Sequence, residues 1–499
     1  MNQRVLVIGG GISGLTSAIY ARKSGFDTLI LESTVNLGGE CTGWDRQGFH
    51  IDNSIHWLLG TDPYQDLYKV WCQVGALGPD VKTTPLDPFF ATDTPSGRKF
   101  HMYLDLDKLR AEMISFGPED EEAIDEFISA LQAYGLMLQN AEVPMEISSL
   151  RYKLRFVWSM RKVIPIHRKF ATITIEEYSR RFKSEDLRFV MNCYFPKGYY
   201  AEALLYILGY AVKGNTNLPE GGSLALEQRM ERKYAELGGK VRTSAPVEKI
   251  IVKDGKAVGV QLRGGEILEA EYVISSVSPQ LLLDKMLDGR FEDGFFHSRL
   301  RDRRNFPTFS NTVVYIGCEG DPGDIDSTAI LKVKPFRIGR RLHDHVLFHH
   351  YADEPHFAPK GHFVLQCLMM QYEADFETWK RYHEESAARY REEKKIMADA
   401  LLQRLSEKFP HLAGKMKVLE VTTPMSFHKR CGSHKGSYMS FIRTPYAGTA
   451  SHTGRIPGLK NLYVGGQWTI CGGMPCAVMS GRFATQRLCH DAKVPFVQD

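Results

Sequence analysis

The chain begins with short apolar runs separated by glycine. Residues 4–8 (RVLVI) are mostly apolar and too few for a helix, which predicts a buried strand. A glycine run fills residues 9–14, and apolar positions recur at helical spacing over residues 15–22. Gly25 stands where a helix C-terminal glycine belongs, and residues 28–31 (TLIL) are a second short apolar run. This order predicts strand, glycine-rich turn, helix and strand, the opening unit of a doubly wound α/β fold.

The glycine run has the spacing GxGxxG at Gly9, Gly11 and Gly14. The first glycine permits a tight turn, the second lets the backbone approach a pyrophosphate, and the third lets the helix pack closely on the strand. The helix N-terminus offers free N–H groups and a partial positive charge to the phosphates. Glu32 ends the second strand, where a carboxylate accepts hydrogen bonds from ribose hydroxyls and repels a 2′-phosphate. The sequence therefore predicts a site for FAD or NAD rather than NADP.

Longer patterns farther along the chain predict helices outside this unit. Residues 119–138 have an amphipathic pattern with an acidic start, which suits a helix N-terminus. Residues 373–408 form one long helical pattern dense in Glu, Lys and Arg, which we interpret as a solvated face with helix-spaced ion pairs. The chain of 499 residues exceeds what one hydrophobic core usually serves, so we expect two structural domains.

Residues 151–170 combine seven Lys and Arg residues with Phe, Trp, Ile and Val, and they contain no acidic residue. One interpretation is a peripheral membrane contact, in which aromatic side chains enter the headgroup region and cations meet anionic lipid. The other is a helix with one basic face over the core, or the wall of an entrance channel. The sequence leaves both interpretations open.

Composition narrows the partners and the compartment. A net charge of +4 is too small to predict nucleic-acid binding, and we expect none. The nine cysteines form no CxxC pair, and their odd number favours reduced thiols over a disulfide framework. No apolar run is long enough to cross a bilayer, and a strand at residues 4–8 stands where a leader would. We expect a cytoplasmic protein, which the membrane interpretation would place peripherally on the inner face of a membrane.

Histidines cluster between residues 343 and 356 without a matching pattern of Cys or carboxylate ligands. A metal site needs ligands that converge at fixed geometry. His343 and His345 alternate onto one face of a strand, but no Cys or carboxylate pattern accompanies them. We therefore expect these histidines to belong to the core or the surface, and we predict no metal site.

Three separated blocks of sequence share the pattern of one enzyme family. The first extends from Val5 to about Gly60 and contains Gly38-Gly39 after the second strand. The second, residues 217–276, begins with a Pro-x-Gly-Gly element, and the third, residues 457–482, contains two further Gly-Gly pairs. Together they resemble the FAD-dependent amine oxidase and phytoene desaturase superfamily. Residues 39–42 and 52–57 are most similar to its phytoene desaturase, carotenoid isomerase and retinol saturase branch.

The resemblance implies non-covalently bound FAD, held by residues of all three blocks. The implied cofactor contacts are Gly9, Gly11, Ile12, Ser13, Gly14, Glu32, Ser33, Gly38, Gly39, Glu40, Asn53, Ser54, Ile55, Val247, Ser275, Gly465, Gly466, Gln467, Gly473, Met474 and Pro475. The chain departs from the family where Arg or Lys commonly follows the first Gly-Gly, since it has Glu40 there. It also has Gln467 where an acid is frequent, and Ile470-Cys471 in place of a frequent Pro-Gly.

The resemblance also implies the fold class, a Rossmann-type FAD-binding domain of the GR2 kind with an α+β substrate-binding domain. The FAD domain is expected to be discontinuous, because the blocks lie at both ends and in the middle of the chain. The expected segments are 1–95, 211–300 and 416–499 for the FAD domain, and 96–210 and 301–415 for the substrate domain.

The implied activity is desaturation or saturation of carbon–carbon double bonds by hydride transfer at flavin N5. The expected substrate is a hydrophobic polyene, an isoprenoid of carotenoid or retinoid type, or a fatty acyl chain. An acid or base near the far carbon completes the reaction, and His56 is a candidate for it, the alternative being a structural histidine beside Trp57. The polar run at residues 427–437 is a second source of a proton, or an ordinary loop. No second dinucleotide motif is present, so the electron partner stays unidentified.

Two other activities remain open on the same fold. One is a redox-neutral cis–trans or positional isomerase of the same substrates. The other is a flavin amine oxidase, whose aromatic cage beside the flavin would use Trp468 or Tyr463. Product mass separates the first alternative from the leading hypothesis, because desaturation or saturation changes the mass by two hydrogens and isomerisation does not.

Overall fold

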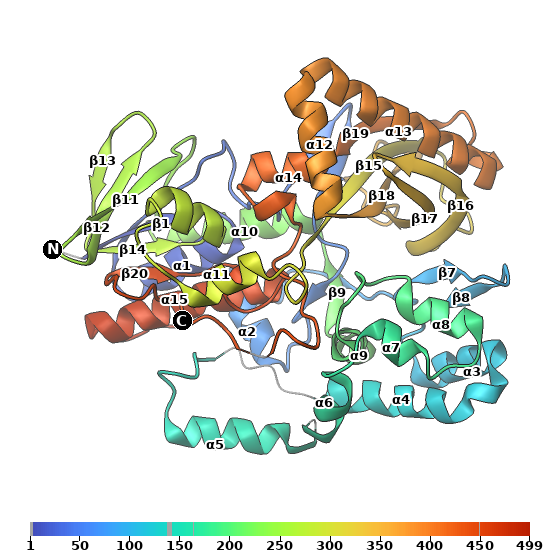
Figure 1. The fold of residues 1–499 in the computed structure, drawn as a ribbon, viewed down its shortest axis with the longest axis horizontal. Helices are drawn as coiled ribbons and strands as arrows, with labels where there is room; N and C mark the ends of the chain where they lie inside the picture. Colours follow the sequence, from blue (N-terminus) through green and yellow to red (C-terminus); the bar gives the residue numbers. More distant parts are fainter. Residues whose placement is uncertain (1–2, 137–141, 163, 449) are drawn as a thin grey trace.

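The computed structural model of the protein describes residues 3–136, 142–162, 164–448 and 450–499 (Figure 1). Its central sheet is five-stranded and parallel, with the order β10-β2-β1-β14-β20. The strands come from the start, the middle and the end of the chain: β1 (Arg4–Ile8), β2 (Asp27–Leu31), β10 (Lys240–Arg242), β14 (Tyr272–Ser275) and β20 (Leu462–Val464). The structure thus brings the three blocks of sequence into one Rossmann-type sheet.

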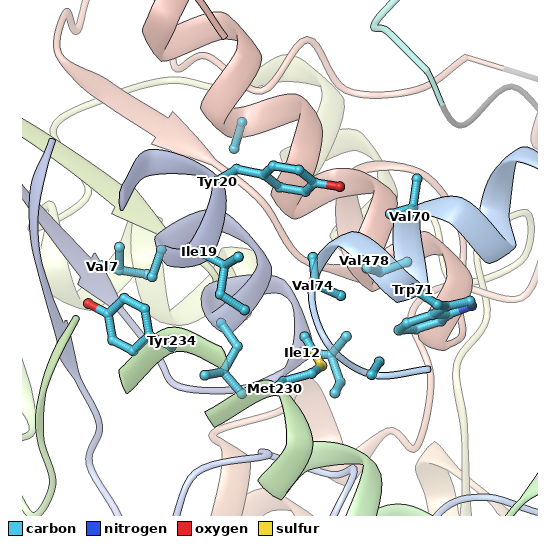
Figure 2. Close-up of a cluster of buried hydrophobic side chains, with 14 of the residues drawn as sticks. Val7, Ile12, Ile19, Tyr20, Val70, Trp71, Val74, Met230, Tyr234 and Val478 are labelled. Atoms are coloured by element: carbon cyan, nitrogen blue, oxygen red, sulfur yellow. The ribbon is translucent and has the colours of Figure 1, made fainter. Parts of the chain in front are cut away.

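Helix α1 (Ile12–Lys23) forms the centre of the layer on one face of this sheet. Residues 12–21 are all buried, because the helix is enclosed by the sheet and by other helices rather than facing water on one side. It packs against α10 (Gly222–Glu236) and α15 (Met474–Ala492), and α2 (Asp66–Gln73) packs against α15. Figure 2 shows this core, in which Ile12 and Ile19 of α1 lie among Met230, Trp71 and Val478 from the other three helices.

An antiparallel hairpin sheet lies within the second block. It contains β11 (Val247–Lys253), β12 (Lys256–Leu262) and β13 (Ile267–Glu269), and it leads directly into β14 of the central sheet. The chain then continues through the π-helical turn η3 (Leu281–Met286) and α11 (Gly294–Arg301).

A second large sheet has seven strands in the order β19-β15-β18-β17-β16-β7-β8. It is antiparallel except where β16 pairs with β7. Its strands are β7 (Ala91–Asp93), β8 (Lys99–His101), β15 (Phe309–Glu319), β16 (Thr328–Ile338), β17 (Arg341–His350), β18 (His362–Tyr372) and β19 (Met416–Thr422). Helices α12 (Glu373–Glu385) and α13 (Ala387–Lys408) pack on it, and together they enclose a separate core (Figure 1).

A helical layer completes the second half of the molecule and has its own buried core. Its helices are α3 (Leu106–Phe116), α4 (Glu121–Gly135), α5 (Leu150–Ser159), α6 (Ile164–Phe170), α7 (Ile175–Ser179), α8 (Glu185–Asn192) and α9 (Ala201–Val212). Helix α5 lies at the outer edge of this layer in Figure 1. None of the helices within the described ranges has the length and apolar character required to cross a membrane.

Short elements connect these layers. The strands are β3 (Gly43–Arg46), β4 (Phe49–Asp52), β5 (Leu58–Leu59), β6 (Thr83–Thr84) and β9 (Thr216–Pro219). The short helices are η1 (Pro118–Asp120), η2 (Met160–Lys162), η4 (Pro410–Leu412), α14 (Pro424–Cys431), η5 (His434–Gly436) and η6 (Gln467–Thr469).

Two of the predicted helices differ from the structure in extent. The pattern at 119–138 corresponds to η1 followed by α4, and residues 137 and 138 lie outside the described part of the chain. The prediction of one long helix over 373–408 was wrong, because Ser386 has extended backbone angles and separates α12 from α13. The Ser386 hydroxyl accepts a hydrogen bond from the backbone N–H of Arg389 at 3.0 Å, which caps the new helix.

The expected domain segments can be compared with the sheets. Strand β7 lies inside the segment 1–95 assigned to the FAD domain, yet it pairs in the seven-stranded sheet. Strand β19 begins just after residue 415 and also belongs to that sheet. Both strands lie directly beside the expected boundaries of these segments.

Candidate active site

A cavity of about 1050 Å³ lies where the carboxyl ends of β1 and β2 meet the helical layer and the seven-stranded sheet. Residues from all three sequence blocks line it. Open parallel sheets bind ligands at this edge, where strands end and helices begin. Its volume is at the upper end of the usual range for small-molecule sites, so it can hold a large cofactor with a substrate beside it.

The glycine turn after β1 forms one end of this cavity. Gly9 has a φ of +92°, and Gly11 pairs with Gly38 of the second glycine element across an isolated bridge. The N–H of Gly38 donates to the Gly10 carbonyl at 2.9 Å, which ties the two glycine turns together. A Cβ on Gly14 would lie 1.9 Å from the Gly9 carbonyl oxygen, so only glycine allows α1 to begin so close to β1.

Glu32 lies buried at the end of β2, in the wall of the same cavity. One of its carboxylate oxygens accepts from the N–H of Gly10, and the other accepts from the N–H of Thr34, both at 2.8 Å. The hydroxyl of Ser33 donates to the second oxygen at 3.1 Å. These bonds hold the carboxylate beside the glycine turn, in the position expected of a ribose-binding acid.

The third block closes the cavity from the other end of the chain. The N–H of Gly466 donates to the hydroxyls of Ser13 and Ser480, at 2.8 and 2.9 Å. A Cβ on Gly465 would lie 2.7 Å from the Ser13 hydroxyl oxygen, so the strand end passes very close to α1. The side-chain oxygen of Gln467 accepts from the N–H of Gly473 at 2.9 Å, which shapes the loop before α15.

Most of the sequence-predicted site residues line the cavity. They are Gly9, Gly11, Ile12, Ser13, Glu32, Ser33, Gly38, Gly39, Glu40, Ser54, His56, Val247, Gly466, Gln467, Gly473, Met474 and Pro475. Gly14, Asn53, Ile55, Ser275 and Gly465 lie behind the wall instead. The Asn53 amide donates to the Glu40 carbonyl at 2.9 Å, and the Ser275 carbonyl accepts from the N–H of Gly465 at 2.8 Å. These residues support the wall rather than form it.

Asp52 joins the first block to the second, a role that the sequence did not reveal. Its fully buried carboxylate accepts from the backbone N–H groups of Ser54, Ile55 and Ser223 and from the Ser223 hydroxyl, at 2.5 to 3.1 Å. A Cβ on Gly222 would lie 2.1 Å from this carboxylate, which explains the second glycine of the Pro-x-Gly-Gly element. The only signal was that Asp52 and Ser223 each belong to a resembling block.

Glu40 is half-buried and lines the cavity near Arg430. Burial raises the pKa of the Glu40 carboxyl from its ordinary 4.5 to about 8, although the positive charge of Arg430 lowers it. The Arg430 guanidinium donates to the Gly39 carbonyl at 3.0 Å, so it is held beside the second glycine turn. At neutral pH Glu40 is therefore a protonated acid at the cavity wall. The sequence suggested a proton source within 427–437, and the structure places Arg430 from that run in the cavity.

His56 lines the cavity, and its Nε2 lies 2.9 Å from the side-chain oxygen of Gln366. The Gln366 amide nitrogen donates to the Asp52 carbonyl at 3.3 Å, which orients its oxygen toward the histidine. Nε2 therefore carries the proton and donates it to Gln366. Burial lowers the pKa of His56, so the ring is neutral. The histidine is positioned at the wall with a fixed tautomer.

Aromatic and aliphatic side chains form the wall away from the glycine turns. They include Trp57, Tyr194, Phe195, Tyr199, Tyr206, Phe309, Leu347 and Leu368. The Trp57 indole N–H donates to the Tyr194 hydroxyl at 3.2 Å, and Tyr194 stacks on Phe90 with ring centroids 5.1 Å apart. The indole N–H of Trp57 and the hydroxyl of Tyr194 thus bond to each other within the wall, and the space beside it suits a hydrophobic ligand.

The remaining candidates are resolved by their contacts. Trp468 lines the cavity, whereas Tyr463 is buried in β20, where its hydroxyl donates to Asp491 at 3.0 Å. His349 contacts Thr328, and His350 contacts the Ile325 carbonyl. Among the residues that the structure describes, no group of three or more His, Cys, Asp or Glu side chains is arranged to hold a metal ion.

The fold and the site define a flavin-dependent oxidoreductase. The Rossmann-type sheet carries two glycine turns and an acid after β2, and these line a large cavity whose other wall is apolar. Residues 12–489 match the family described as flavin containing amine oxidoreductase, and the chain belongs to that family. Its cofactor is a flavin. The glycine turns form a cradle that a Cβ would fill, and Glu32 lies beside this cradle, so these residues fit that group.

Individual relatives cover nearly the whole chain. A phytoene desaturase (lycopene-forming) from Paracoccus sp. (strain N81106 / MBIC 01143) is 26% identical over 509 residues, with 97% of both chains covered. Prolycopene isomerase 1, chloroplastic, from an Oncidium hybrid cultivar is 24% identical, covering 97% of this chain and 84% of the relative. A redesigned putrescine oxidase has the same fold, with a TM-score of 0.64 at 15% identity and 98% coverage of both chains.

Proposed function

We propose that the protein binds FAD non-covalently and uses it to desaturate or saturate carbon–carbon double bonds of a hydrophobic polyene, isoprenoid or fatty acyl substrate. The observation that carries this proposal is the continuity of the cavity. One wall is the glycine cradle with Glu32, and the other is aromatic and aliphatic, with no barrier between them. A flavin held in the cradle therefore shares its space with an apolar ligand.

The polar contacts around the cradle support FAD as the form of the flavin. Backbone N–H groups of the glycine turns and the N-terminus of α1 suit a pyrophosphate, and Glu32 suits an adenosine ribose. Val247 and Arg263 line the cavity beyond Glu32, where the hairpin sheet offers a surface for an adenine. All of these contacts are non-covalent, and together they hold a dinucleotide without a bond to the protein.

The chain's own residues can donate and accept the proton that the reaction requires. A bound flavin exchanges an electron pair with its substrate, and the protein orients the substrate and manages charge. Glu40 holds a proton at the cavity wall at neutral pH and can give it to, or take it from, a substrate carbon. Neutral His56 adds a second polar position on the same wall, with its tautomer fixed by Gln366. The aromatic wall excludes water from the reacting carbons.

The exposed apolar side chains of helix α5 support the proposal that the substrate is taken up from a membrane surface. Leu150, Leu154, Val157 and Trp158 have 72%, 62%, 59% and 65% of their surface exposed, an unusual concentration for one short helix. The Arg161 guanidinium lies 3.6 Å from the centre of the Trp158 ring. Phe156 of the same helix and Met160 just after it line the cavity. We propose that this face touches a bilayer and that the substrate enters beside α5. Residue 163 of the basic run lies outside the described residues.

A redox-neutral isomerase is the second candidate, because a relative at 24% identity over almost the whole chain is a prolycopene isomerase. Of the two residues expected to form the aromatic cage of an amine oxidase, Trp468 lines the cavity, whereas Tyr463 is directed to Asp491 behind the wall.

Anaerobic incubation with a linear isoprenoid polyene in phospholipid vesicles tests the proposal. We expect bleaching of the oxidised flavin by the polyene, or reoxidation of pre-reduced flavin, together with a product that differs by two hydrogens. A product of unchanged mass formed only with reduced flavin would establish the isomerase instead. Flavin that responds to a primary amine and to none of the apolar substrates would refute both.

A further inference from the structure

Two cysteines of the third block meet at the wall of the flavin cavity. Cys471 lies in the loop after η6, and Cys476 lies in the first turn of α15. Their sulfur atoms are 2.6 Å apart, closer than van der Waals contact, and both residues line the cavity. A small displacement brings such a pair to bonding distance. Gly473 lies between them with a φ of +108°, a backbone conformation that lets the loop turn back on the helix.

The two sulfurs have different surroundings. Cys471 is half-buried, whereas Cys476 is buried with 5% of its surface exposed. A hydrogen bond from Cys476 and the positive charge of Arg443 lower the pKa of the Cys471 thiol. The same hydrogen bond, together with burial, raises the pKa of Cys476. Dithiols that exchange electrons pair a more accessible thiolate, which reacts with the external partner, with a buried thiol.

Cys471 also faces a second, small pocket of about 30 Å³. Arg443, Gly448 and Ala450 are among its lining residues, and the last two are exposed, so this pocket lies beside a segment at the protein surface. The cysteine therefore stands between the flavin cavity on one side and the exterior on the other.

We propose that Cys471 and Cys476 are a redox-active dithiol that passes an electron pair between the bound flavin and an external dithiol or disulfide. The inference rests on the flavin of the proposed function but not on its hydrophobic substrate. It supplies the electron partner that the sequence left unidentified, because the chain has no second dinucleotide motif.

The exchange balances in two steps. In the first, the two cysteine thiols lose their protons and form one S–S bond, and the electron pair reduces the oxidised flavin. In the second, an external dithiol attacks that S–S bond at Cys471, the bond breaks, both cysteines return to thiols, and the external dithiol becomes a disulfide. The sequence of steps runs in reverse when the flavin must be reoxidised and an external disulfide is available.

Two measurements on the full-length holoprotein test the proposal. In the first, the protein is treated with oxidised glutathione, remaining thiols are alkylated, and peptides are mapped by mass. We expect Cys471 and Cys476 to be joined in a disulfide with the loss of two hydrogens. Recovery of both as alkylated thiols would overturn the proposal. This measurement does not depend on the flavin, so it separates failure of the pair from failure of the cofactor assignment.

In the second measurement, the oxidised holoprotein is titrated anaerobically with dithionite. We expect wild type to take up two electron pairs per flavin, and Cys471→Ser and Cys476→Ser to take up one. Cys72→Ser is the matched control, because Cys72 is also half-buried but does not line the cavity, and it should keep both pairs. Dithiothreitol should bleach the flavin of wild type at least tenfold faster than that of Cys476→Ser, an order of magnitude typical of losing one thiol of a pair. A single electron pair in wild type, or equal bleaching rates, would refute the exchange.

Discussion

Replacing Glu40 by Gln is the most informative single change in the cavity. The carboxyl has its pKa raised by burial from 4.5 to about 8, with Arg430 acting in the opposite direction. A shift of one pKa unit corresponds to about 1.4 kcal/mol, so the raised pKa means that the enclosed site opposes ionisation of Glu40 by about 5 kcal/mol at most. Water screens part of this free-energy cost, because the Glu40 side chain is only half-buried. The sign is the same at any magnitude: the folded protein holds this proton more tightly than the unfolded chain.

The pH dependence follows from that sign. Between pH 4.5 and about 8, the folded state binds more protons than the unfolded state, so the contribution of Glu40 to stability falls as pH rises. One proton limits the slope to about 1.4 kcal/mol per pH unit. Glu40→Gln removes this contribution. The free energy of unfolding of wild type minus that of the variant should therefore fall between pH 4.5 and about 8 and be constant above that range.

Infrared difference spectra of wild type minus Glu40→Gln, recorded on either side of pH 8, measure the proton directly. We expect the stretching band of a protonated carboxyl below about pH 8 and its replacement by carboxylate bands above. Arg430→Met should move the transition to higher pH, since Arg430 lowers the pKa of Glu40. Carboxylate bands already present at pH 6, with no effect of Arg430→Met, would refute the reasoning.

Three further changes test other parts of the site. Glu32→Gln should weaken FAD binding about tenfold, measured by fluorescence titration, because a charged acceptor for the ribose is lost; unchanged affinity would contradict its role. Gly14→Ala should destabilise the protein by about 1–3 kcal/mol in thermal unfolding, because its Cβ would meet the Gly9 carbonyl. Trp158→Ser should reduce sedimentation with anionic phospholipid vesicles about tenfold, since an exposed anchor is lost.

Matched controls exist for the last two changes. Gly294→Ala adds a Cβ where no heavy atom lies within 4 Å, so it should leave the unfolding temperature unchanged. Ile267→Ser removes an exposed apolar side chain, 57% exposed, from the hairpin sheet, and it should leave vesicle binding unchanged. Equal losses in the control and the test variant would show that the effect is not specific to the site.

The parts of the structure that the sequence predicted are those set by local pattern. The β1–α1–β2 unit depends on apolar runs and glycines that are neighbours in the chain. The structure gives a backbone reason for two of these glycines: Gly9 has a positive φ, and Gly14 lies too close to the Gly9 carbonyl to carry a Cβ. The break at Ser386 was missed because its flanking residues continue the same helical pattern. It is revealed by the Ser386 hydroxyl, which caps α13 by accepting from the Arg389 N–H.

Contacts between distant residues were beyond the reach of the sequence. The tautomer of His56 depends on Gln366 in β18, 310 positions along the chain. The two cysteines at 471 and 476 are close in sequence but form no CxxC pair, so only the turn at Gly473 brings their sulfurs together. The pairing of His56 with Gln366 follows from the order of the strands in the sheets, which the three blocks did not determine.

Identification of the released cofactor tests the central claim most directly. The protein is expressed without added flavin, purified and denatured, and the visible spectrum and mass of what separates from the chain are recorded. The account predicts an oxidised flavin spectrum and the mass of intact FAD in the soluble fraction, with an unmodified polypeptide. A colourless protein that cannot be reconstituted with FAD, or a flavin that stays attached to the denatured chain, would contradict it.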